Sequence, residues 1–222
     1  MENLFFNTNL PHIYNSCGIN SLFIALAQLK VRSNDELIDN MIQYCSTKRK
    51  LDYMMEDQKR GLNLMVQFYK KFNIDHGYHN VRLLLTKIYN SLIFDDSQIE
   101  IGDDYEKISL TKKIILLDME QTKSMTEYNK HFEDKTNKIV TYDDKDFNNV
   151  SILKFNDIIY VPCLYIICLG NHYITLVNTK AGLIVYNDLD RVKIINQYEV
   201  RKKLISLSDS VEFIGYINFK SN

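Results

Sequence analysis

The sequence changes character near residue 93, and this change constrains the fold more than any other feature. Before it, apolar residues recur at helical spacing, as Leu22, Leu26 and Leu29 do at i, i+4 and i+7. After it, short β-branched runs alternate with glycines and with pairs of aspartates, which is typical of strands joined by turns. Helices followed by strands of this kind predict an α+β fold with an antiparallel sheet.

The helical part is expected to hold four helices, at about 17–31, from a start at 33–36 to residue 45, at 51–72 and at 80–92. The strands are expected within 108–119, at 138–142, 158–169, 172–178, 183–187 and 211–219. We expect residues 120–137 to form a polar segment on the surface. We also expect a hairpin turn at 179–182 and a short helix at 197–207. We expect one compact domain over residues 1–222, with a helical lobe over about 1–92 and a β-rich lobe over about 93–222.

Composition excludes several classes of function. With a net charge of −1, the chain lacks the excess of positive charge that would favour binding to nucleic acid or to an anionic membrane. No apolar run reaches the ~18 residues of a transmembrane helix, and the first residues lack the basic start of a signal peptide. The four cysteines form no C-x-x-C pair, so we expect no zinc site and no cofactor, and a reducing compartment such as the cytoplasm.

One cysteine stands where a helix is expected to begin. Asn15 and Ser16 are good N-cap residues, which places Cys17 in the first turn. The unpaired N–H groups and the positive dipole end of that turn favour a thiolate, the nucleophilic form of cysteine. The alternative is a cysteine that only packs in the core, as most buried cysteines do.

A base for this cysteine is expected on the strand that begins at His172. The predicted hairpin returns this strand to a partner that ends in Tyr186, Asn187 and Asp188. An amide or carboxylate there can accept the imidazole N–H and select the tautomer. The alternative is a strand-end histidine beside an ordinary Asn-Asp turn.

These two segments are similar to the boxes of one family of thiol proteases. The cysteine segment matches a box that reads N-x-G-N-T-C-Y-x-N-S at Asn15, Cys17, Asn20 and Ser21. The second segment echoes a histidine box at Gly170, His172-Tyr173, Tyr186-Asn187-Asp188 and Val192, and residues 213–219 look like the family's closing strand. The chain therefore resembles the ubiquitin-specific proteases, which are papain-like deubiquitinases.

The resemblance implies a papain-like fold and a site for hydrolysis after the ubiquitin C-terminal glycine. Cys17 would be the nucleophile, His172 the base and Asn187 its orienter, with Asp188 as the second candidate for that role. The resemblance also implies His12 as an oxyanion donor and Gly170 and Tyr173 as substrate contacts. It implies ubiquitin or a ubiquitin-like modifier and its conjugates as partners, a monomeric enzyme, and neither metal nor cofactor.

Several departures mark a reduced member of the family, such as a viral or other pathogen protein acting in the host cytoplasm. His12 and Tyr14 replace an Asn and a Gly of the cysteine box, and Asn171 is an extra residue before His172. The two C-x-x-C pairs of the zinc-bearing insertion are absent. Two alternatives remain open: a degenerate module that binds ubiquitin or another protein without cleaving it, and a cysteine protease with a non-ubiquitin substrate.

Overall fold

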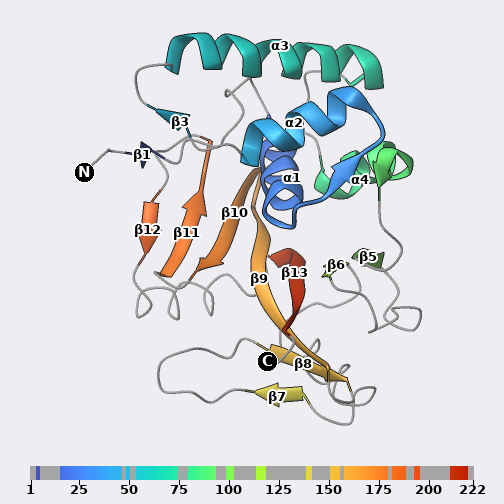
Figure 1. Cartoon of the computed structure of the whole chain (residues 1–222), viewed down its shortest axis with the longest axis vertical. Coiled ribbons are helices and arrows are strands. Elements are labelled where there is room, and N and C mark those ends of the chain that lie inside the picture. Colours follow the sequence, from blue (N-terminus) through green and yellow to red (C-terminus); the bar gives the residue numbers. More distant parts are fainter. Residues whose placement is uncertain are drawn as a thin grey trace. The chain divides into compact units, whose positions relative to one another are not determined.

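A computed structural model describes the chain over residues 4–5, 16–46, 49–50, 54–74, 80–93, 99–102, 114–118, 139–141, 151–155, 158–179, 182–188, 193–195 and 211–219 (Figure 1). The chain divides into two compact units. The first unit comprises Met1–Ile93, Leu169–Thr175 and Val185–Lys193, and the second comprises Phe94–Cys168, Leu176–Ile184 and Ile194–Asn222. The assignment of the whole chain to one domain stays a prediction.

The first unit contains the expected helices. They are α1 (Cys17–Gln28), α2 (Glu36–Ser46), α3 (Met54–Phe72) and α4 (Val81–Ile88), and a 3-10 turn over Tyr89–Ser91 follows α4. Among the described helices, none combines the length and the hydrophobicity needed to cross a lipid bilayer.

Helix α1 ends earlier than the sequence predicted because the backbone turns left-handed after Leu29. Lys30 has φ 57°, a conformation more often taken by glycine. The N–H of Lys30 donates to the Ala27 carbonyl at 3.0 Å, and the N–H of Val31 donates to the Leu26 carbonyl at 3.0 Å. This pair of bonds closes a Schellman motif, which satisfies carbonyls that the helix would otherwise leave open.

Helix α1 is the core of the first unit. Every residue from Cys17 to Ala27 is buried, as expected for a helix that is apolar on all sides. Helices α2 and α4 pack on α1, and α3 packs on α2, so that α3, α2 and α1 follow one another in Figure 1. Phe68 of α3 reaches Phe23 of α1 edge to face, with ring centroids 5.5 Å apart.

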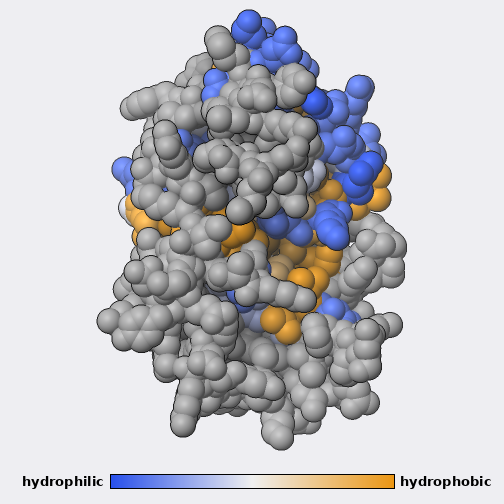
Figure 2. All heavy atoms as spheres, turned by 60° about the vertical axis from the view of Figure 1, so that its left-hand side comes forward, coloured by the Kyte–Doolittle hydropathy of each residue, from blue (hydrophilic) through white to orange (hydrophobic). Residues whose placement is uncertain are grey.

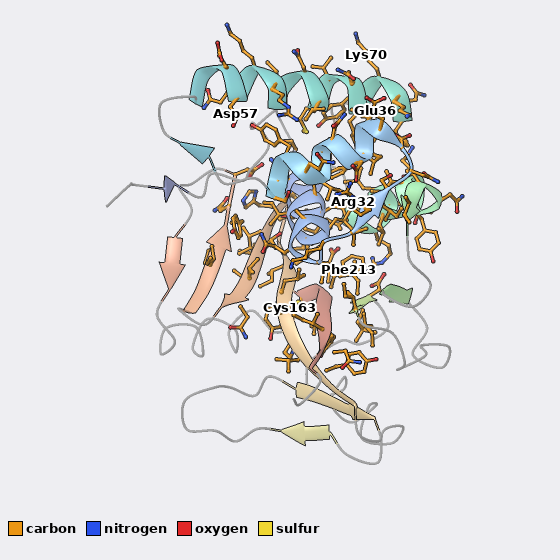
Figure 3. The ribbon with its side chains drawn as sticks, in the orientation of Figure 1. Arg32, Glu36, Asp57, Lys70, Cys163 and Phe213 are labelled. Carbon is orange, nitrogen blue, oxygen red and sulfur yellow. The ribbon has the colours of Figure 1, made fainter. Side chains whose placement is uncertain are left out.

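The outer face of α3 carries the polar side chains of this helix. Lys70 points away from α2 in Figure 3, and hydrophilic side chains gather at the top of Figure 2, where α3 lies. Two apolar side chains also stand exposed on α3, Leu62 and Val66. Isolated exposed apolar residues of this kind are normal on a protein surface.

The strands of the main sheet follow the order β12-β11-β10-β9-β13-β6-β5, and β8 pairs with β9 and with β7. Their bounds are β5 Ile99–Gly102, β6 Ile114–Asp118, β7 Ile139–Thr141, β8 Ser151–Phe155, β9 Ile158–Leu169, β10 His172–Thr179, β11 Gly182–Tyr186, β12 Lys193–Ile195 and β13 Val211–Phe219. Two short pairs lie apart from it, β1 (Leu4–Phe5) with β3 (Arg49–Lys50) and β2 (Arg32–Ser33) with β4 (Leu92–Ile93).

The long apolar strands agree with the sequence predictions, whereas several short strands were not predicted. Strands β9 and β13 have the predicted bounds, whereas β5, β8 and β12 were not predicted. The antiparallel pairing expected for the sheet is found between β13 and both β6 and β9, and between β8 and both β7 and β9, whereas β5 and β6 run parallel at one edge. The predicted excursion at 120–137 and helix at 197–207 lie outside the described residues, as do Lys180 and Ala181 of the predicted hairpin turn.

In the second unit, β9 and β13 approach each other closely at Gly215. A Cβ at this position would stand 2.7 Å from the Leu164 side chain, so any larger residue would force that side chain to move. The thiol of Cys163 on β9 donates to the Gly215 carbonyl at 3.2 Å, beside Phe213 of β13 (Figure 3). Burial raises the pKa of Cys163 to about 12, so this cysteine is a structural hydrogen-bond donor and not a nucleophile.

Candidate active site

Cys17 is the first residue of α1, as the sequence predicted, and it is 4% exposed. Ser16 occupies the N-cap position, and its carbonyl accepts the first intrahelical bond from the Asn20 N–H at 2.9 Å. The hydroxyl of Ser16 accepts the side-chain amide of Asn20 at 3.4 Å. Asn15, the other N-cap candidate, lies outside the described residues.

The sulfur of Cys17 contacts the main chain on both sides of His172. Its thiol donates to the Asn171 carbonyl across 3.9 Å, and the backbone N–H of Tyr173 hydrogen-bonds to it. The tight turn between β9 and β10 makes this possible. It begins at Gly170, whose φ of 64° is one that L side chains rarely adopt.

His172 is oriented by Asn187, the residue that follows β11. The distance between Nε2 of His172 and Oδ1 of Asn187 is 2.7 Å. An amide oxygen only accepts, so Nε2 of the neutral ring carries the proton and Nδ1 keeps its lone pair. A histidine in this tautomer can take a proton at Nδ1.

Asp188 binds α1 instead of the imidazole. Its Oδ2 accepts the side-chain amide of Asn20 at 3.0 Å, while its Oδ1 stands 3.8 Å from Nε2 of His172, too far for a hydrogen bond. The Asp188 side chain is only 1% exposed. Of the two candidates for orienting His172, the hydrogen bond is therefore made by Asn187, and Asp188 contributes a buried charge close by.

A second buried hydrogen bond joins α1 to the strand that begins with His172. The hydroxyl of Thr175 on β10 donates to the Ser21 carbonyl of α1 at 3.1 Å, and both residues are buried. This bond secures the helix that carries Cys17 against the strand that carries His172 (Figure 1).

The surroundings of Cys17 work against the thiolate that the sequence predicts at the helix start. Burial raises the pKa of the Cys17 thiol, and the negative charge of Asp188 raises it further. Hydrogen bonds from the backbone N–H groups of Tyr173, Gly18 and Cys17 lower this pKa, but burial outweighs them. The thiol is protonated at neutral pH, and deprotonating it requires a base.

We expect the alkylation of Cys17 by iodoacetamide to show this directly. Only the thiolate reacts, so a pKa above the ordinary value of 9.0 makes the rate small at neutral pH and still rising above pH 9. The measurement is the rate of carbamidomethylation of the Cys17 peptide by mass spectrometry as a function of pH. A plateau that is reached below pH 8 would contradict the raised pKa.

The remaining predicted site residues divide into two groups. Tyr173 is 1% exposed and its backbone N–H hydrogen-bonds to the Cys17 sulfur, whereas Gly170 is exposed. His12 lies outside the described residues. Within the described part of the chain, no group of three potential ligands could hold a metal ion.

Sequence reasoning missed the Asn171 carbonyl and the Asn20–Asp188 bond. The carbonyl could not be found, because a main-chain contact leaves no signal in residue type. A weak signal for Asn20 was present, since it stands three residues after Cys17 and so near the same face of α1.

Comparison with known proteins supports the fold and leaves the family open. No protein family matches the sequence, and no curated protein does so either. Among solved structures, the SAGA Ubp8/Sgf11/Sus1/Sgf73 DUB module bound to ubiquitin aldehyde is similar at a TM-score of 0.54 and 14% identity, covering 100% of this chain and 71% of the other. The papain-like protease of MERS coronavirus is similar at 0.51 and 10%, covering 96% and 66%.

A third similar structure is an essential yeast splicing factor, with a TM-score of 0.52 and 7% identity over 99% of this chain and 70% of the other. Identities this low establish the fold alone. The chain has the mixed helix-and-sheet fold of USP-type and papain-like proteases, as the sequence predicted.

Proposed function

We propose that this chain is a thiol-dependent deubiquitinase that hydrolyses the bond after the C-terminal glycine of ubiquitin or of a ubiquitin-like modifier. The observation that carries the proposal is the arrangement around Cys17. Its sulfur touches the backbone on both sides of His172, and Asn187 fixes the tautomer of that histidine. A cysteine hydrolase needs a nucleophile, a base and a group that orients the base, and Cys17, His172 and Asn187 are the proposed residues for these three roles.

The proposed reaction begins with transfer of the thiol proton from Cys17 to Nδ1 of His172. The sulfur then attacks the glycine carbonyl, and its electron pair moves onto the carbonyl oxygen. The Cys17 N–H and His12 are the proposed donors to that oxyanion. Collapse breaks the carbon–nitrogen bond as the imidazolium protonates the lysine amine, and water then hydrolyses the thioester with His172 as the base.

The raised pKa of Cys17 fits this sequence of steps. The thiol can transfer its proton to His172 once substrate is bound, and the charge of Asp188, 3.8 Å from Nε2, stabilises the positive charge that develops on the ring. The proposed setting is a reducing cytoplasm, because the nucleophile must remain a thiol.

A second candidate is a module of this fold that binds protein without cleaving it. One similar structure is described as a splicing factor, which favours the view that this fold also serves functions other than proteolysis. A third candidate is a cysteine protease with another substrate, and the similar coronavirus enzyme favours that one.

The decisive experiment incubates the protein with ubiquitin that carries a C-terminal propargylamide. A deubiquitinase forms a vinyl thioether between Cys17 and the probe, seen as an intact-mass shift and located by peptide mapping. Binding of ubiquitin without an adduct would favour the binding module. If the protein neither binds ubiquitin nor forms an adduct but does cleave unrelated peptides, the third candidate is favoured.

A further inference from the structure

The proposed reaction gives no role to the buried bond between Asn20 and Asp188. It joins the first turns of α1 to the residue that follows Asn187, over a sequence separation of 168 residues. Asn20 is 2% exposed, and the Asp188 side chain is 1% exposed. A carboxylate removed from water in this way depends on nearby hydrogen-bond donors to stay charged.

The orientation of the Asn20 amide indicates that its hydrogen bond serves the Asp188 carboxylate. Its nitrogen faces Asp188 and Ser16, while no described residue donates to its buried Oδ1. Leaving an amide oxygen unsatisfied is unfavourable, so the amide is held in the orientation that serves the carboxylate. With Oδ2 of Asp188 engaged in this way, Oδ1 is the oxygen that faces Nε2 of His172.

We propose that Asn20 is a positioning residue that holds the Asp188 carboxylate beside the His172–Asn187 pair. The inference rests on the proposed function for its catalytic consequence. Asn20 keeps the carboxylate from rotating toward Nε2 and displacing Asn187, and at the same time holds its charge close enough to favour the imidazolium.

The same charge has opposite effects on the two members of the pair. It favours protonated His172, which the departing amine needs, and it disfavours the Cys17 thiolate, whose pKa it raises. Loss of the positioned carboxylate should therefore slow hydrolysis and speed simple alkylation of Cys17. A mere loosening of the fold would not move these two rates in opposite directions.

The test is a double-mutant cycle of Asn20→Ala and Asp188→Asn on hydrolysis of a ubiquitin C-terminal fluorogenic reporter. Each single change should lower kcat roughly tenfold and leave KM within about twofold, and the double variant should lose no more than Asp188→Asn alone. Losses that multiply to roughly a hundredfold would overturn the inference. If Asn20→Ala does not fold, Asn20→Leu replaces it, because leucine keeps the volume and lacks the amide.

The matched control is Thr175→Val, which also removes one buried hydrogen bond between α1 and a distant segment. This bond does not involve Asp188, so its loss should combine multiplicatively with Asp188→Asn. Identical behaviour of the Asn20 and Thr175 variants would reduce Asn20 to a structural contact and overturn the inference.

A second readout separates this inference from the proposed function. If the wild-type protein does not hydrolyse the reporter, the proposed function fails, and the cycle is read on the rate of Cys17 alkylation by iodoacetamide. Asp188→Asn and Asn20→Ala should each speed alkylation, and Asn20→Ala should have no further effect once Asp188 is replaced. An effect of the same size in both backgrounds would overturn the role of Asn20.

Discussion

Replacing Cys17 by alanine should abolish hydrolysis of a ubiquitin C-terminal reporter, with a loss of kcat on the order of 10⁶. The sulfur supplies the only covalent step of the proposed reaction, and a methyl group cannot replace it. The measurement is reporter turnover, with adduct formation by the propargylamide probe as a second signal. Thermal unfolding should change little, because alanine keeps the first turn of α1.

The matched controls for this prediction are Cys45→Ala and Cys163→Ala. Cys45 is buried, and Cys163 is half-buried and donates to the Gly215 carbonyl. Their loss should lower the unfolding temperature and leave the kcat of the folded protein unchanged. Unchanged turnover in Cys17→Ala would end the assignment of the nucleophile.

The second large effect is expected at Asn187. Replacing Asn187 by alanine removes the acceptor 2.7 Å from Nε2 and frees the His172 ring to rotate and change tautomer. We expect kcat to fall by roughly 10² to 10⁴, the range for disturbing a positioned acid–base group. Asn187→Asp should be tolerated, because a carboxylate oxygen accepts the same bond. The measurement is kcat and KM for the reporter.

The matched control for this prediction is a change at the neighbouring residue, Asp188. Asp188 stands 3.8 Å from Nε2, so Asp188→Asn should cost far less than Asn187→Ala. A ranking in the opposite order would mean that the carboxylate and not the amide orients His172 during turnover.

The helices and the central strands could be predicted because their patterns are local. The leucine spacing of residues 22–29 and the β-branched run of β9 each indicate one structure. The left-handed end of α1 at Lys30 could not be predicted, because lysine does not signal that conformation. Short strands such as β5 also escaped, since their pairing with β6 depends on residues distant in the sequence.

The candidate site was predictable in its residues and not in its electrostatics. The structure places the Cys17 sulfur against the backbone at Asn171 and places His172 within hydrogen-bond distance of Asn187, while the catalytic roles of these residues stay a prediction. The pKa of Cys17 depends on how deeply the helix start is buried and on a carboxylate 171 positions away, which no local pattern reveals (188 − 17). For this reason the sequence predicts a thiolate that the surroundings of Cys17 work against, although the position of the cysteine was correct.

The contacts of the Cys17 sulfur with Asn171 and Tyr173 are made by peptide groups, which every residue except proline supplies in full. These contacts therefore set no requirement on the side chains at the two positions, as long as the turn at Gly170 keeps its left-handed geometry. At position 170 the constraint is one of handedness and not of volume, since a Cβ there would meet no atom within 4 Å. Because these contacts are made by the main chain, they leave little trace in the residue types that a sequence comparison detects.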